Sequence, residues 1–273
     1  MESLNWGLST HLFVYQPLSA EALDTIKDMG IQQIELWGMR PHFDYMDAQT
    51  VTRLKADLAQ RGMRVYAVHA PFYAHVEQLK QGREISLCAD NPAQREQSRQ
   101  HIGMVMELLP QLGAKTLILH VGGLHDEFSS PRIELFKESG LKLLPQLERL
   151  DLKLALENIA TPLSALSNLI ALVREINSPR VGLCLDIGHA NLQGRPGEAI
   201  ERCAGSLLAV HLSDNDGQSD QHLVPGEGNI PWPEVIRRLD KIGFNGPLTL
   251  ELRQYGDWAV TKEKIVKCLK YKF

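Results

Sequence analysis

Eight short apolar runs, separated by stretches with helical periodicity, constrain the fold of this 273-residue chain more than any other feature. Six of the runs read RVYAVHAPF, KTLILHVGG, LKLALENIA, RVGLCLDIGHA, LLAVHLSD and PLTLELR. Each is rich in Val, Leu and Ile and is followed by a turn, as is typical of strands buried on both faces. We expect strands at residues 4–9, 32–38, 64–70, 115–121, 153–159, 180–187, 207–214 and 247–253. We expect helices at residues 19–30, 47–62, 91–113, 131–150, 163–176, 197–205, 232–243 and 258–271.

This regular alternation of strand and helix predicts a parallel (β/α)8 TIM barrel that forms a single domain over residues 1–273. The length suits that fold, which typically needs about 250 residues. A hydrophobic content of 44% is ample for its core. The alternative is an open doubly wound sheet. It is disfavoured because no Gly-rich phosphate turn opens any of the helices.

Side chains that can bind a metal lie at the ends of the expected strands or in the few residues that follow. They are His69, His120, Glu157, Asp186, His189, His211, Asp220, His222 and Glu251. In a barrel the carboxyl ends of the strands converge on one face, and that face carries the chemistry. The long loops at residues 71–92 and 214–233 follow strands, so they belong to the same face.

Four of these side chains, Glu157, Asp186, His211 and Glu251, follow four consecutive strands. Three carboxylates and one imidazole suit a hard or borderline divalent ion such as Mn, Mg, Co or Zn. Without a cation, carboxylates buried together would repel one another strongly. For any one of them, a salt bridge or a helix cap is the alternative role.

The other five, His69, His120, His189, Asp220 and His222, are candidates for additional metal binding or for substrate binding. For each histidine the alternative is a hydrogen-bonded core residue. The Asp220-x-His222 pair would place both side chains on one side of an extended loop.

Aromatic side chains near the strand ends are candidates for substrate binding. Trp37 and Phe72 would form a flat apolar wall for a sugar ring, and ordinary packing is the alternative.

Composition narrows the function classes. The formal net charge of −4 shows no basic footprint for nucleic acid. The first residues have no secretory pattern, and no apolar stretch is long enough to span a membrane. The cysteines are scattered without a CxxC pair, which favours a reducing cytoplasm. The sequence leaves a homo-oligomer open.

The motifs resemble the xylose isomerase-like TIM-barrel superfamily of sugar and sugar-phosphate isomerases and epimerases, which also includes endonuclease IV. The resemblance rests on HAPF, LILHVGG, LALENIA, LCLDIGHANL, VHLSDNDGQSDQHLVPGEGNIPW and LTLEL, and it covers essentially the whole chain. It implies that Glu157, Asp186, His211 and Glu251 bind one divalent ion. It also implies that Glu157 and Glu251 act as acid and base on opposite faces of the substrate. The resemblance to endonuclease IV implies that all nine side chains could instead hold three zinc ions.

The resemblance therefore implies a divalent-metal-dependent sugar or sugar-phosphate isomerase or epimerase that moves a proton through an enediolate. In that enzyme His189 and His222 would hold hydroxyls or a phosphate. The alternative is a multinuclear zinc phosphodiesterase of the endonuclease IV type, an AP endonuclease. Three features depart from the endonuclease pattern. They are the acidic net charge, the sequence GLSTHLF at the tip of the first strand and the sequence ENIA at the end of the fifth strand. A polyol dehydratase and a non-catalytic polyol-binding barrel are less favoured alternatives.

Overall fold

The computed structural model describes residues 4–123 and 126–270, and its strands close into a barrel. The strands are β1 Trp6–Ser9, β2 Gln33–Trp37, β3 Arg64–His69, β4 Thr116–His120, β5 Lys153–Glu157, β6 Val181–Asp186, β7 Leu207–Leu212 and β8 Leu248–Leu250. The α-helices are α1 Ala20–Asp28, α2 Ala48–Arg61, α3 Val76–Lys80, α4 Pro92–Leu112, α5 Ser130–Leu141, α6 Leu144–Arg149, α7 Leu166–Ile176, α8 Ile187–Leu192, α9 Pro196–Arg202, α10 Trp232–Lys241 and α11 Trp258–Lys270. A 3-10 helix, η1, spans Thr10–Phe13.

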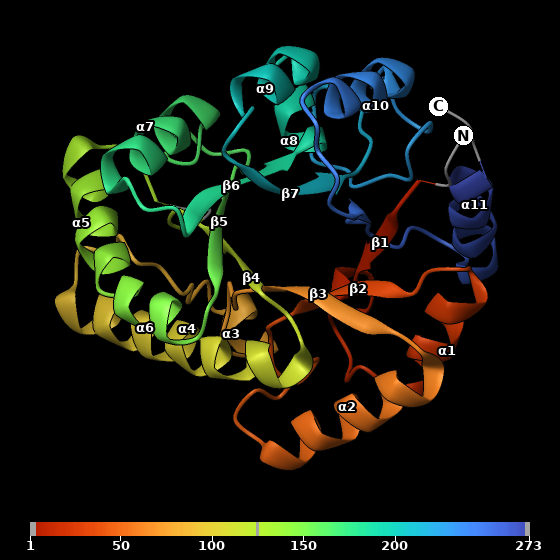
Figure 1. Ribbon diagram of the computed structural model, residues 1–273, viewed down its shortest axis with the longest axis horizontal. Coiled ribbons are helices and arrows are strands. Elements are labelled where there is room, and N and C mark those ends of the chain that lie inside the picture. Colours follow the sequence, from red (N-terminus) through yellow and green to blue (C-terminus); the bar gives the residue numbers. More distant parts are fainter. Residues whose placement is uncertain (1–3, 124–125, 271–273) are drawn as a thin grey trace.

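The predicted (β/α)8 barrel is confirmed. All neighbouring strands pair in parallel in sequence order, and β1 closes the barrel against β8. The helices form an outer ring around the strands (Figure 1). The main hydrophobic core packs the outer faces of the strands against these helices, as expected for strands that read as continuous apolar runs. Within the described ranges, no helix combines the length and the apolarity needed to cross a bilayer.

The expected helix at residues 131–150 is two helices, α5 and α6. Pro145 lies in the first turn of α6. A proline has no N–H to donate to the preceding turn, and its ring crowds the residues before it, so a continuous helix breaks there. Two short helices, α3 and α8, occupy segments that were expected to be loops. The expected end of the last helix at residue 271 lies outside the described residues.

Gly182 in β6 allows β6 and β7 to approach each other closely. A Cβ atom at this position would lie 2.5 Å from the carbonyl oxygen of Ser206 and 2.7 Å from Cγ of Leu208. The pairing register of the two strands also shifts just after this point, between Leu183 and Cys184. Since β6 and β7 carry Asp186 and His211 at their ends, this contact helps to position the candidate site.

We expect Gly182→Ala to lower the free energy of unfolding by about 1–3 kcal/mol, because the added methyl overpacks a rigid strand contact. Gly140→Ala in α5 is the matched control. Its Cβ would meet Phe136 at 3.7 Å, an ordinary contact, so the change should be neutral or stabilise the helix by up to about 1 kcal/mol. Urea unfolding of both variants measures the difference. Equal stabilities would contradict the close approach of β6 and β7.

Candidate active site

The ends of four consecutive strands bring together the four side chains that were predicted to form one metal site. Each of the four side chains offers one oxygen or nitrogen atom that lies within 4.8 Å of the corresponding atoms of the other three. The residues are Glu157, Asp186, His211 and Glu251. None of the four residues is more than 2% exposed. Strand register explains the gathering, because Asp186 pairs with His211 across β6 and β7. Inward-facing residues at the same height in a barrel must meet at its axis.

Glu157 is the centre of this cluster. Its Oε2 lies 3.0 Å from Nε2 of His69 and 3.0 Å from Nε2 of His120, and its Oε1 lies 2.9 Å from Nδ1 of His211. His69 ends β3, His120 ends β4 and His211 lies in β7. The Glu157 carboxylate therefore links these three strands to β5. A second candidate metal group, His69, His120 and Glu157, therefore shares Glu157 with the first.

Two carboxylate oxygens in the cluster are buried without a hydrogen-bond partner. They are Oδ2 of Asp186 and Oε1 of Glu251. The other oxygen of Asp186 caps α8 by accepting the backbone N–H of His189 at 2.6 Å. A buried carboxylate oxygen with no donor is costly unless a cation compensates it. The donor set and these two oxygens therefore fit a divalent ion.

A third candidate metal group consists of His189, Asp220 and His222. Oδ1 of Asp220 lies 3.3 Å from Nε2 of His189 and 3.1 Å from Nε2 of His222, yet it has no hydrogen-bond partner. Each imidazole is anchored through Nδ1 to a main-chain carbonyl, of Asn158 and of Glu251, both at 2.9 Å. Such anchoring is the usual arrangement of metal-binding histidines. Asp220 and His222 do share one side of the loop, but His222 has a φ of +50°, so the loop is not extended there.

The loop that carries Asp220 and His222 is held by Asp214, a buried residue at its start. The Asp214 carboxylate accepts the backbone N–H groups of Gly226 and Ile230 and the indole N–H of Trp232. A Cβ at Gly228 would lie 2.2 Å from the carbonyl oxygen of Asn215, so only glycine fits there. The PGEGNIPW segment thus closes the loop onto Asp214.

The cluster carries an excess of negative charge. Burial lowers the pKa of His211. The effect of the neighbouring groups is larger and holds this pKa well above its usual value; these groups are the thiol of Cys184 and the carboxyl groups of Glu35, Glu251 and Glu157. Burial also lowers the pKa of His189, and Asp186 and Asp220 reverse this effect and raise it to about 10.

The carboxyl groups themselves differ. Burial raises the pKa of Asp186 to about 6. Burial also raises the pKa values of Glu157 and Glu251, but the adjacent imidazoles, His211 foremost, overcome it and hold both below the usual value. The two glutamates are therefore ionised at neutral pH, and the cluster attracts positive charge.

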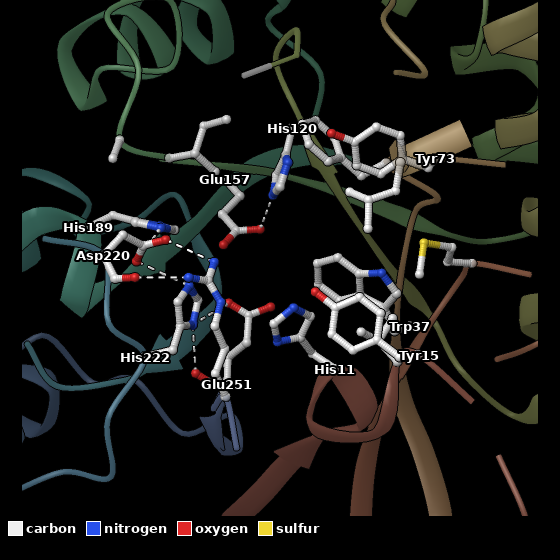
Figure 2. Close-up of a pocket in the computed structure, with 17 residues that line it drawn as sticks. His11, Tyr15, Trp37, Tyr73, His120, Glu157, His189, Asp220, His222 and Glu251 are labelled. Carbon is white, nitrogen blue, oxygen red and sulfur yellow. Dashed lines mark hydrogen bonds and ion pairs between the residues drawn. The ribbon is translucent and has the colours of Figure 1, made fainter. Parts of the chain in front are cut away.

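A cavity lies above the cluster, and its lining includes both aromatic side chains predicted from the sequence (Figure 2). Trp37 stacks on His69 with ring centroids 3.8 Å apart, and Phe72 meets His120 edge-on at 4.9 Å. His120, Glu157, His189, Asp220, His222 and Glu251 also line the cavity. His69, Asp186 and His211 lie buried beneath it.

The cavity wall also contains residues that were not among the predicted site residues. They are His11, Val14, Tyr15, Met39, Tyr73, Leu79, Ile159, Ala160 and Arg253. Most follow β1, β2 and β3, where apolar residues read as ordinary packing. Their position just after a strand end was the available signal.

In TIM-barrel enzymes the active site lies at the carboxyl ends of the strands, which is where this histidine- and carboxylate-rich cluster lies. Residues 23–271 match the xylose isomerase-like TIM barrel family, and the chain belongs to that family.

Two relatives that match most of this chain are distant from it in sequence. An uncharacterized protein of Methanocaldococcus jannaschii is 26% identical over 97% of this chain and 88% of the relative. The fructoselysine 3-epimerase of Escherichia coli O157:H7 is 25% identical over 82% of each chain. The crystal structure of a D-tagatose 3-epimerase-like protein has a TM-score of 0.81 and 24% identity over 97% of both chains, which supports the fold.

We expect metal binding to release protons and to strengthen as pH rises. The raised pKa values of His211 and His189 mean that both imidazoles hold a proton near neutral pH in the metal-free protein. An ion must displace those protons, and below about pH 6 protonation of Asp186 adds to the competition. Calorimetric titration with Mn²⁺ between about pH 6 and pH 8, in two buffers of different ionisation enthalpy, measures both effects. A pH-independent affinity without proton release would contradict the prediction.

We expect His222→Ala to lower the metal-to-protein ratio, because the third group then keeps only His189 and Asp220. From the sequence we expected His222 to hold substrate. Anchoring through Nδ1 leaves Nε2 of both imidazoles for a metal, which is the alternative that this variant tests. Elemental analysis of protein purified in the presence of Zn²⁺ measures the ratio. His101→Ala is the control, since His101 contacts Tyr45 away from the cluster. An unchanged ratio together with a raised Michaelis constant would restore the substrate-binding role.

Proposed function

We propose that this protein is a divalent-metal-dependent sugar epimerase or isomerase in which Glu157 and Glu251 transfer the proton. One observation carries the proposal. The carboxylates of Glu157 and Glu251 point into the same space from opposite sides of the cavity (Figure 2). Both also approach Nδ1 of His211, at 2.9 and 3.4 Å. Two bases on opposite sides of one bound carbon are what inversion at that carbon requires.

Glu157, Asp186, His211 and Glu251 would hold the ion. A bound divalent ion polarises a sugar carbonyl and makes the proton on the adjacent carbon more acidic. The unpartnered oxygens of Asp186 and Glu251 support this assignment, because they are the oxygens left free for a cation.

Either glutamate can act as the base. The imidazoles around them keep both pKa values low, so each begins as a carboxylate at neutral pH. One carboxylate removes the proton beside the carbonyl. The other glutamate must first take up a proton from solvent, and it gives that proton to the opposite face of the carbon. If the proton is returned to the neighbouring carbon instead, the reaction is an aldose–ketose isomerisation. Trp37 and Phe72 wall the cavity and limit the access of water.

We propose an unphosphorylated ketose as the substrate class. The cavity of about 190 Å³ suits a small molecule. Among the described residues that line it, Arg253 is the one Lys or Arg side chain. Its guanidinium already donates to the Asp220 carboxylate at 3.1 Å, and the described lining has no second Lys or Arg to pair with a phosphate. The name of the fructoselysine 3-epimerase relative supports inversion at C3 of a ketose.

A second candidate function is a multinuclear zinc phosphodiesterase, and one observation favours it. Four groups of the described residues could hold an ion, and three of these groups together use all nine predicted side chains. Several ions side by side stabilise attacking and leaving oxygens in phosphodiester hydrolysis. The acidic chain and the aromatic wall of a small cavity favour the sugar substrate over a duplex.

We expect Glu157→Gln and Glu251→Gln each to lower turnover by at least about 10²–10⁴-fold, since each change removes one general base. Exchange of the substrate proton with deuterated water resolves the two roles. Each variant should lose exchange with the epimer whose proton faces the missing carboxylate. It should retain some exchange with the other epimer.

Glu148→Gln, on the exposed surface, is the control and should behave as the wild type. The proposal fails if the wild-type protein exchanges no proton of any ketose or aldose. Cleavage of a duplex with an abasic site by that same protein would establish the phosphodiesterase in its place.

A further inference from the structure

Glu35 in β2 is a buried carboxylate with no function assigned so far. It is 0% exposed, and its Oε2 lies 2.8 Å from Nε2 of His211. Its Oε1 accepts a hydrogen bond from Ser9 Oγ at 3.0 Å, and the Tyr66 hydroxyl lies 3.3 Å from its Oε2. A buried charge is retained only where its partners compensate the loss of water, and here the main partner is the imidazole of His211.

We infer that Glu35 is a positioning residue that fixes the ring orientation and the tautomer of His211 for metal binding. The Glu35 carboxylate can only accept at Nε2, so Nε2 carries the hydrogen. In the metal-free protein Nδ1 also carries a hydrogen, because the carboxylates of Glu157 and Glu251 face it at 2.9 and 3.4 Å. An ion would displace that hydrogen and leave the one on Nε2 in place. A carboxylate behind a metal-binding histidine raises the basicity of the ligand nitrogen and holds the ring in place.

A bulge in β3 lies beside the Glu35 carboxylate. The pairing of β2 with β3 steps from Ile34↔Val65 to Glu35↔Ala67, so Tyr66 is an extra residue in β3. Such a bulge re-aims a side chain. The Tyr66 hydroxyl contacts both Glu35 and Thr249, and it belongs with the residues packed inside the barrel.

Small side chains leave the space that Glu35 and Tyr66 occupy. Ala67, Ala155, Cys184 and Ala209 lie two residues before His69, Glu157, Asp186 and His211, on the same face of their strands. Larger apolar residues usually fill this layer of a barrel. The polar side chains of Glu35 and Tyr66 therefore occupy this layer, next to the candidate metal site.

This inference rests on the proposed metal-dependent function, because it assigns His211 as a ligand. Its test measures metal binding and needs no sugar substrate. The probe is Co²⁺, whose visible absorption reports the ligands around the ion. Glu35→Gln keeps the size and can still accept a hydrogen bond from Nε2, but it removes the charge. Glu35→Ala removes the support altogether, and Glu148→Gln removes one negative charge from the surface as the control.

We expect Glu35→Gln to weaken Co²⁺ binding by about 10–100-fold, with Glu35→Ala weaker still and Glu148→Gln unchanged. The absorption spectrum of the Co²⁺ complex should also change in Glu35→Gln. Equal dissociation constants and equal spectra for wild type and Glu35→Gln would overturn the inference, even if Glu35→Gln unfolds at a lower temperature. If Glu35→Ala does not fold, Glu35→Gln alone decides. Failure of the wild-type protein to bind Co²⁺ would be a different result, because it would overturn the proposed metal-dependent function as well.

Discussion

The contact of one buried carboxylate, Glu157, with three imidazoles organises the candidate site. His69, His120 and His211 reach it from β3, β4 and β7, so the arrangement exists only when the barrel is closed. Taking these groups out of water is costly, and their mutual attraction only partly compensates that cost. The carboxylates of Asp186 and Glu251 add negative charge with too few donors. A bound cation would compensate this excess of negative charge, so the electrostatics of the cluster favour cation binding.

A second layer of contacts keeps the cluster in place. Asn158 donates to the carbonyl of Asp186 and accepts its backbone N–H, which ties the end of β5 to the end of β6. Asp214 holds the loop that brings in Asp220 and His222. Glu35 supports His211 from below. Because these neighbours restrain Asp186, His211 and the loop of Asp220 and His222, the ligand atoms from these elements converge before any ion or substrate is present.

The same set of ligands can serve more than one reaction, so the cavity wall carries much of the functional argument. Carboxylates and imidazoles at a barrel mouth can activate a sugar carbon or a phosphodiester. Trp37, Phe72 and Tyr73 narrow the cavity with aromatic surface, while Arg253 is already engaged by Asp220. This wall supports the proposed small sugar as substrate over a charged polymer.

The sequence by itself determined the barrel and the nine ligand-type side chains, because both depend on local pattern. An apolar run followed by a polar tip marks a strand end, and parallel strands place all such ends on one face. It could not show how the nine divide into groups, since that depends on distances across the barrel. It also could not show that Glu35 turns inward beside a bulged Tyr66, or that His222 adopts a positive φ. Those features arise from strand register and loop closure, which only the tertiary structure decides, because they join residues far apart in the chain.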